Sequence, residues 1–88
     1  MTSTHHLSLY HRNHCPYCRK VREVIDALRL DIRLVEMEEQ PVEWERLKLE
    51  GGQAMVPCLR IDEEHGTVWM YESEDIIQYL RQTYGRPQ

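Results

Sequence analysis

Apolar residues recur with a period of two in some segments of the chain and with a period near 3.6 in others. Residues 7–10 alternate apolar and polar side chains, which predicts a first strand. From Pro16 onward the apolar residues follow the i, i+3, i+4, i+7 spacing of an amphipathic helix, and they are Val21, Val24, Ile25 and Leu28. Because proline is tolerated in the first turn of a helix, Cys15 is expected at the helix N-terminus and Cys18 one turn further along.

The middle of the chain predicts further strands and a second helix. A short apolar stretch at 32–35 is typical of a strand. A helix is expected over 41–50, because a proline opens this segment and two glycines follow it. Residues 56–61 and 67–71 predict two strands separated by a short polar loop, so these strands are expected to form an antiparallel hairpin.

A last helix is predicted to begin near Ser73. The serine is expected to cap the helix, with Glu74 and Asp75 in the first turn matched to its positive end. The residues expected on its buried face are Ile76, Ile77, Leu80 and Tyr84.

The resulting order, β-α-β-α-β-β-α, predicts an α/β fold. Two strands joined through a helix are expected to run parallel, whereas the two strands of the hairpin run antiparallel. We therefore expect a four-stranded mixed sheet with helices on both faces. At 88 residues the chain is expected to form a single domain over 1–88.

Composition and charge exclude several classes of protein. With 41% hydrophobic and 30% charged residues, the chain has the composition of a globular protein rather than a disordered tail. Its formal net charge of −4 argues against a nucleic-acid-binding protein. No apolar run approaches the roughly 20 residues that span a bilayer, and residues 1–6 lack the features of an export signal. A cytoplasmic protein that binds neither nucleic acid nor membrane is expected.

The three cysteines, Cys15, Cys18 and Cys58, favour a redox or metal motif over a disulfide framework, because their number is odd and no export signal is present. A structural zinc site needs four ligands. His11 and His14 precede the cysteine pair, but these four residues would crowd one short segment. No metal is therefore expected, and His11 and His14, with His5 and His6, are expected to be exposed polar residues.

The C-x-x-C pair at a helix N-terminus is suited to thiol chemistry, since the thiolate is the reactive form of cysteine. Residues 1–22 carry no acidic residue and four basic ones, which are Arg12, Arg19, Lys20 and Arg22. Helix N–H groups, these cations and the thiol of Cys18 are all expected to stabilise a thiolate at Cys15. Cys18 lies farther into the helix and is expected to be shielded and less acidic. Cys15 is thus the expected nucleophile, and Cys18 the thiol that attacks the resulting mixed disulfide.

Cys15-Pro16-Tyr17-Cys18, at a strand-to-helix junction in this element order, resembles the active-site motif of dithiol glutaredoxins in the thioredoxin superfamily. The resemblance extends from about Leu7 to Tyr84 and implies a thioredoxin-like fold. It also implies a cis peptide bond at Val56–Pro57, in a segment opposite the active thiols.

The resemblance also implies a binding site for glutathione. Arg12 matches a basic position that meets a carboxylate of glutathione, and Tyr17 is expected to lie against the thiol-bearing part of the ligand. Val56 and Pro57 are expected to present backbone groups to the tripeptide. The γ-glutamyl end is expected at the start of the last helix, where the residues concerned are Glu72, Ser73 and Glu74.

Two positions depart from the glutaredoxin pattern. Met55 stands where the family usually has threonine, and Tyr71-Glu72 stands where it usually has two glycines. Glu72-Ser73 is similar instead to the N-terminal thioredoxin-like domain of glutathione S-transferases. Transferases add an all-helical second domain, for which 88 residues are expected to leave no room.

The implied function is glutathione-dependent reduction of protein disulfides and glutathione mixed disulfides through Cys15 and Cys18. The expected partners are glutathione and disulfide-containing or glutathionylated proteins, and the chain is expected to be a monomer. Three alternatives remain open: a disulfide reductase recycled by a thioredoxin-type reductase, a carrier of an iron–sulfur cluster or metal, and an inert adaptor of thioredoxin fold.

Overall fold

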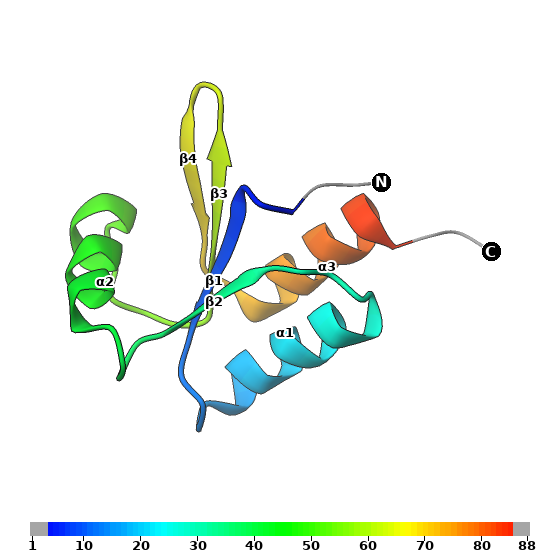
Figure 1. The fold of residues 1–88 in the computed structure, drawn as a ribbon, viewed down its shortest axis with the longest axis horizontal. Helices are drawn as coiled ribbons and strands as arrows, with labels where there is room; N and C mark the ends of the chain where they lie inside the picture. The colour runs from blue at the N-terminus through cyan, green and yellow to red at the C-terminus, as the bar shows by residue number, and fades with distance from the viewer. Residues whose placement is uncertain (1–3, 86–88) are drawn as a thin grey trace.

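A computed structural model describes residues 4–85. Residues 1–3 and 86–88 lie outside the described part, and so does half of the segment 1–6 in which no export signal is predicted. The described elements are β1 (Leu7–His11), α1 (Pro16–Ala27), β2 (Arg33–Glu36), α2 (Pro41–Arg46), a π-helical turn η1 (Leu47–Gly51), β3 (Cys58–Glu63), β4 (Gly66–Met70) and α3 (Ser73–Tyr84) (Figure 1). This order confirms the predicted one, and η1 is an addition at the end of the second predicted helix. No helix within 4–85 has the length and apolar character needed to cross a membrane.

The sheet is mixed and has the strand order β2-β1-β3-β4. β1 runs parallel to β2 and antiparallel to β3, and β3 and β4 form the predicted antiparallel hairpin. Tyr10 lies opposite Cys58 in the β1–β3 register, and Leu59 lies opposite Met70 in the β3–β4 register. The segments that follow β1, β2 and β4 therefore meet the segment that precedes β3 at one end of the sheet, here called the loop end.

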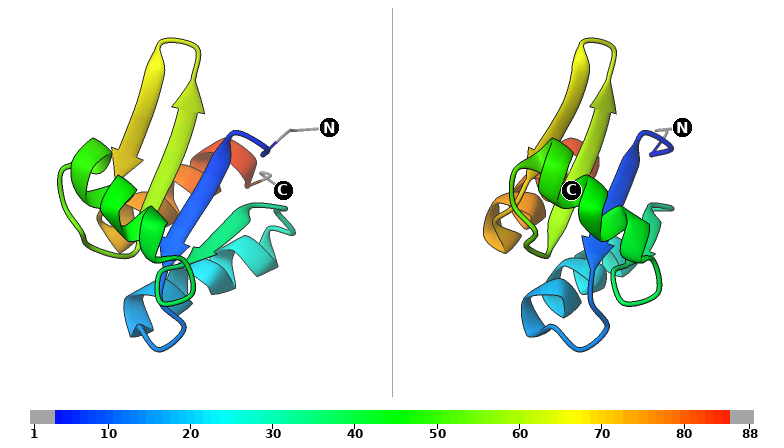
Figure 2. Two further views of the ribbon diagram at one scale, coloured as in Figure 1. Left: turned by 60° about the vertical axis from the view of Figure 1, so that its left-hand side comes forward. Right: turned by 90° about the vertical axis from the view of Figure 1, so that its left-hand side faces the viewer.

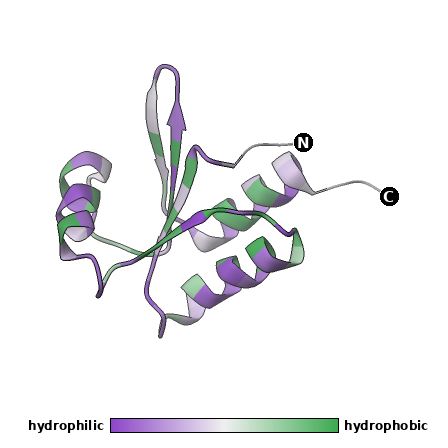
Figure 3. Ribbon diagram, viewed as in Figure 1, coloured by the Kyte–Doolittle hydropathy of each residue, from purple (hydrophilic) through white to green (hydrophobic). Residues whose placement is uncertain are grey.

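Helices cover both faces of the sheet, as predicted. α1 and α3 lie side by side on one face, and α2 lies on the other (Figures 1 and 2). Hydrophobic and hydrophilic residues follow one another along α1 and α3, so each of these helices has an apolar side to bury (Figure 3). The core under α1 and α3 contains Leu7, Leu9, Val21, Val24, Ile25, Ile32, Leu59, Ile61, Ile76, Ile77 and Leu80. The smaller core under α2 contains Tyr10, Val35, Met37, Leu47 and Cys58.

Polar contacts join α2 to the sheet. The buried Tyr10 hydroxyl donates to Glu43 over 2.7 Å and accepts a bond from Arg60 over 3.2 Å. The Arg60 guanidinium also lies 5.3 Å from the centre of the Trp69 ring, and that ring meets Tyr10 edge-on at 5.6 Å. A side chain at Gly51 would collide with the Tyr71 hydroxyl, and the chain leaves η1 at Gly52, whose φ of +95° favours glycine.

All four predicted strands have ends that are wrong by one or two residues: β1 continues to His11, β3 continues to Glu63, and β4 begins at Gly66. The strand predicted at 56–61 begins only at Cys58, because Pro57 has no N–H group to donate to the ladder. The strand predicted to end at residue 71 ends at Met70, and β2 occupies Arg33–Glu36 rather than 32–35. These changes leave the strand pairing as predicted.

The predicted cap of the last helix is also wrong. Glu72, with extended backbone angles, is the N-cap residue, and its carbonyl accepts the first helical bond from the N–H of Ile76. Ser73 is the first residue of the helix itself, and no side chain caps this end. A serine inside the first turn has helical backbone angles and cannot fold back onto its own helix as a cap does.

α1 ends in a Schellman motif. The N–H of Leu30 bonds to the carbonyl of Ile25, and that of Arg29 bonds to the carbonyl of Asp26. Arg29 occupies the left-handed position of this motif with φ +57°. Glycine is the usual residue there, so a non-glycine residue makes this turn less favourable than it could be.

Candidate active site around Cys15

Cys15 lies at the loop end of the sheet, in the connection between β1 and α1. It is the N-cap residue of α1, with extended backbone angles, and its carbonyl accepts the first helical bond from Arg19 over 2.9 Å. The following proline occupies the first turn, as the sequence predicted. Cys15 is half-buried, whereas Cys18 is fully buried against the core, and both are free thiols.

The environment of Cys15 favours its thiolate. Burial alone raises the pKa of Cys15, but the backbone N–H groups of Cys18 and Tyr17, the thiol of Cys18 and the positive charge of Arg22 together lower that pKa below its ordinary value. These N–H groups belong to the first turn of α1, where helix donors have no partner within the helix. Cys15 is therefore both accessible and more acidic than an ordinary cysteine.

Cys18 has the opposite environment, as expected from its position in the helix. Burial and, to a smaller extent, the neighbouring Cys15 thiol together raise its pKa to about 12. Cys18 therefore keeps its proton at neutral pH and can donate it toward Cys15. Two thiols with such different acidity suit a division into an attacking and a resolving group.

The chain leading into Cys15 is held by a polar cluster. The Arg22 guanidinium donates to His11 Nδ1 (3.0 Å), to the carbonyl of Arg12 (3.1 Å) and to that of Asn13 (3.3 Å). The Glu36 carboxylate accepts the backbone N–H of Asn13 over 2.8 Å. The peptide group between Arg12 and Asn13 is thus held at its carbonyl by Arg22 and at its N–H by Glu36, and the next carbonyl is held by Arg22 alone.

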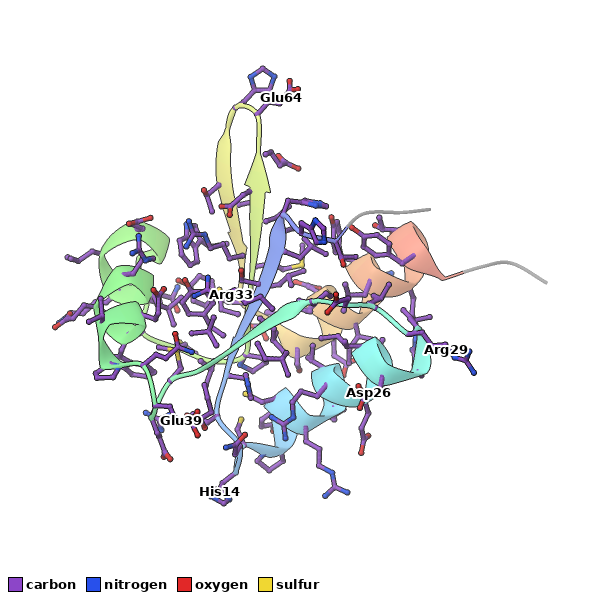
Figure 4. All side chains as sticks on the ribbon, in the orientation of Figure 1. His14, Asp26, Arg29, Arg33, Glu39 and Glu64 are labelled. Carbon is purple, nitrogen blue, oxygen red and sulfur yellow. The ribbon has the colours of Figure 1, made fainter. Side chains whose placement is uncertain are left out.

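His11 is not the exposed residue that the sequence predicted. Its side chain is 3% exposed and faces Arg22, and burial together with that charge lowers its pKa. Glu36 is also buried, and backbone N–H groups, first that of Asn13, lower its pKa. His14, in contrast, is exposed as predicted and lies at the tip of the loop before α1 (Figure 4).

Sequence reasoning included Arg22 among the cations near Cys15 but missed its contacts with His11 and the loop backbone, and it missed the burial of His11 and Glu36. Two signals were nevertheless present. Continuing the alternation of β1 places His11 on the same face as Leu7 and Leu9, toward α1. Cys15, Cys18 and Arg22 follow the i, i+3, i+7 spacing of a single helix face. Glu36 became identifiable only from the β1–β2 register, which pairs it with His11.

The segment before β3 reaches the same end of the sheet. The Val56–Pro57 peptide bond is cis, which confirms that prediction; Val56 is half-buried and Pro57 is buried. The Tyr71 hydroxyl donates to the carbonyl of Gln53 and accepts the N–H of the same residue, at 3.0 and 3.3 Å. These two hydrogen bonds fix the start of the segment that precedes β3. Within this segment the Met55 side chain is 56% exposed.

Arg12 and Tyr17 are two exposed members of the predicted glutathione site. The Arg12 guanidinium lies 4.8 Å from the centre of the Trp44 ring, in a cation–π contact with α2. Together with Trp44, Pro41 and Met37 it lines a shallow hollow beside that helix, which also includes Glu38 and Glu45. The Tyr17 side chain is 62% exposed at the first turn of α1.

The three predicted residues at the start of α3 differ in what they can offer a ligand. Glu72 and Glu74 are exposed, and Ser73 is half-buried. The Glu74 carboxylate is bonded to Lys20 on α1 over 3.0 Å, with both side chains largely in solvent. A ligand ammonium would have to compete with that lysine, although an exposed ion pair of this kind is worth at most about 1 kcal/mol.

Within residues 4–85, no group of three or more histidine, cysteine, aspartate or glutamate side chains is arranged to hold a metal ion.

Comparison with known proteins shows that the chain is similar to glutathione S-transferases and to glutaredoxins. A family model described as "Glutathione S-transferase, N-terminal domain" matches residues 9–88. Glutaredoxin 2 of Escherichia coli strain K12 is 31% identical over 81 residues, which cover 92% of this chain. Glutaredoxin-C4 of Arabidopsis thaliana is 29% identical over 86 residues, covering 89% of this chain and 64% of that protein. The chain spans only 35% of the length of the E. coli relative.

Solved structures show the same thioredoxin-like fold. A glutathione transferase homologue from Drosophila mojavensis, determined with bound glutathione, has a TM-score of 0.74 at 26% identity, over 91% of this chain and 36% of that one. An epsilon-class glutathione S-transferase from the housefly, Musca domestica, has a TM-score of 0.71 at 26% identity, over 92% of this chain and 36% of that one.

Proposed function

Because the chain belongs to the glutathione S-transferase N-terminal-domain family, we propose that it uses glutathione, and that it does so as a thiol–disulfide oxidoreductase with Cys15 as nucleophile and Cys18 as resolving thiol. One observation carries the second half of this proposal. An accessible thiol of lowered pKa lies at the start of α1 beside a buried thiol whose pKa is about 12. We further propose that residues 1–88 act as one thioredoxin-fold domain in this reaction.

The proposed reaction on a glutathionylated protein has two exchange steps. The Cys15 thiolate attacks the glutathione sulfur of the mixed disulfide, the old S–S bond breaks, and the substrate protein leaves as a thiolate that takes up a proton. A second glutathione, as its thiolate, then attacks the Cys15–glutathione disulfide. This attack yields oxidised glutathione and restores the Cys15 thiolate. For a disulfide within a protein, Cys18 resolves the mixed disulfide instead, and two glutathiones later reduce the Cys15–Cys18 bond.

Glutathione is proposed to lie across the loop end of the sheet. Its glycyl carboxylate would pair with Arg12, and its main chain would meet the backbone of Val56 before Pro57. The γ-glutamyl end would lie at the N-terminus of α3, with Ser73 and the free N–H groups of the first turn receiving its carboxylate. Glu72 or Glu74 would accept from its ammonium group, and Tyr17 would cover the cysteinyl part.

The proposal is tested with the purified protein in two parallel assays. One follows glutathione-dependent reduction of a small mixed disulfide, and the other follows conjugation of glutathione to an electrophilic aryl halide. Turnover in the first assay and none in the second supports the oxidoreductase. The reverse result would support transferase activity, the second candidate, which the family match favours. Replacing glutathione by a thioredoxin-type reductase tests whether that system recycles the dithiol.

Replacing Arg12 by alanine is expected to weaken the use of glutathione about tenfold. A charge-assisted hydrogen bond is worth roughly 1.5–3 kcal/mol, and exposure places this one at or below the low end. The loss should be larger at low salt, because salt already screens the wild-type contact. Apparent affinity for glutathione, measured at two ionic strengths, gives the result, and Arg12→Lys serves as the charge-preserving control. Equal affinity in the wild type and Arg12→Ala at both ionic strengths would place the glycyl end elsewhere.

Replacing Ser73 by alanine is expected to weaken glutathione use less than Arg12→Ala does, and with little dependence on salt. The substitution removes a hydroxyl but leaves the helix N–H groups in place. Since Ser73 makes no capping hydrogen bond, the midpoint of thermal unfolding should stay close to that of the wild type. A clear drop in that midpoint would mean that the serine has a structural role not visible in its contacts.

A further inference from the structure

We propose that Arg22 is a positioning residue for Cys15, and this inference deepens the proposed function. Its guanidinium fixes residues 11–13, the backbone that leads into the nucleophile, and brings a positive charge to the helix face that carries the thiolate. Neither the C-x-x-C motif nor the expected glutathione contacts include this residue.

The hydrogen bonds of Arg22 connect it directly to the backbone of the nucleophile. The carbonyl of Arg12 accepts from the guanidinium over 3.1 Å and also from the N–H of Cys15 over 3.3 Å. One oxygen therefore joins the arginine to the residue that attacks. The bond from the guanidinium to the Asn13 carbonyl, 3.3 Å long, holds the next peptide group.

Glu36, the last residue of β2, holds the loop before Cys15 from the side opposite Arg22. Glu36 accepts the N–H of Asn13 over 2.8 Å, and its other oxygen accepts the N–H groups of Glu38 and Glu39 at 2.6 and 3.3 Å. The peptide group between Arg12 and Asn13 is therefore held by a cation from α1 and an anion from β2. A loop fixed in this way keeps the Cys15 backbone at the helix start, where the free N–H groups point.

His11 sets the orientation of the guanidinium. Its Nδ1 lies 3.0 Å from an Arg22 nitrogen, and because arginine only donates, the histidine nitrogen must accept. This requires a neutral ring with its proton on Nε2. The lowered pKa of the buried His11 keeps the ring neutral at pH 7.

Electrostatics supports the same assignment. Cys15, Cys18 and Arg22 occupy positions i, i+3 and i+7 of α1 and its N-cap, and so share one side of the helix. The positive charge of Arg22 lowers the pKa of Cys15, in addition to the effects of the Cys18 and Tyr17 backbone and the Cys18 thiol. The other two cations of α1 form ion pairs with carboxylates, Arg19 with Glu23 and Lys20 with Glu74.

The test measures the acidity of Cys15 itself, so it does not depend on whether glutathione is the reductant. The reduced protein is alkylated with iodoacetamide from pH 4 to pH 9, and the rate at Cys15 is followed by peptide mass spectrometry. Wild type is compared with Arg22→Met, Arg22→Gln and Arg22→Lys. Arg29→Met is the matched control, because it removes one cation from the other end of the same helix segment (Figure 4).

We expect the alkylation midpoint to rise in the order wild type, Arg22→Lys, then Arg22→Gln and Arg22→Met. For Arg22→Met we expect the midpoint to rise by about half a pKa unit. Because each unit changes the thiolate fraction about tenfold below the midpoint, the rate at pH 6 should then fall about threefold. Arg29→Met should titrate like the wild type. Lysine restores the charge but cannot reach all three acceptors as the planar guanidinium does, so its rescue should be partial.

A purely structural role would give a different result. In that case Arg22→Met lowers the midpoint of thermal unfolding while Cys15 titrates as in the wild type, and the proposal is overturned. If Arg22→Met does not fold, Arg22→Gln and Arg22→Lys decide the question by the same titration. Unchanged Cys15 titration in both would also overturn it.

Discussion

Replacing Cys15 by serine should abolish thiol–disulfide exchange with every disulfide substrate, a loss of at least about 10³-fold in rate. A serine hydroxyl at this position would receive the same helix N–H groups but would stay protonated at neutral pH, so no nucleophile would form. Neither remaining thiol can substitute, because Cys18 and Cys58 are both buried and burial raises the pKa of each to about 12. Glutathione-coupled reduction of a small mixed disulfide measures the loss.

The matched control is Cys58→Ala. This thiol lies in the core under α2 and touches none of the proposed reacting atoms, so activity should remain near the wild-type level. Residual activity in Cys15→Ser well above the uncatalysed rate would show that another group attacks the disulfide. That result would refute the assignment of the nucleophile.

Replacing Cys18 by serine should separate the two proposed routes. Reduction of glutathione mixed disulfides should continue, because a second glutathione resolves the Cys15–glutathione bond. Reduction of disulfides within proteins should fall by at least about 10²-fold, because the intramolecular attack by Cys18 is lost and with it a high effective concentration. Both rates are measured on the same preparation, one with a small mixed disulfide and one with a protein disulfide.

Serine is the suitable replacement because its hydroxyl can still donate to the Cys15 thiolate, as the Cys18 thiol does. Cys18→Ala removes this donor, and the pKa of Cys15 should then rise. Comparing the two variants distinguishes the loss of the resolving thiol from the loss of the hydrogen bond. Equal inactivation of Cys15→Ser and Cys18→Ser with the mixed disulfide would contradict the proposed roles.

The element order and the sheet could be predicted because they follow from local signals. The stripe from Val21 to Leu28 identifies one helix, and the short loop before β4 permits only a hairpin. Errors remained at element ends. Ser73 looked like a cap by its residue type, but capping depends on backbone angles, and the chain reaches those angles one residue earlier, at Glu72.

The candidate site was predictable only where a motif identifies it. Cys15, Cys18 and the cis bond before Pro57 follow from residues that are adjacent in the sequence. The cluster of His11, Arg22 and Glu36 draws on a strand end, a helix and a second strand. These three residues meet only once β1 and β2 pair in register and α1 packs on the sheet, so no local pattern reveals that they form one cluster.

The burial of Cys58 bears on how the protein would withstand oxidants. Burial raises the pKa of this thiol to about 12, so it stays protonated at pH 7, and peroxides react with the thiolate. Because Cys58 is sealed beneath α2 and flanked by Pro57, oxidants would first meet the more acidic Cys15. Damage would then fall on the thiol that has a neighbour able to reverse it, since Cys18 can condense with a sulfenic acid at Cys15 to form a reducible disulfide.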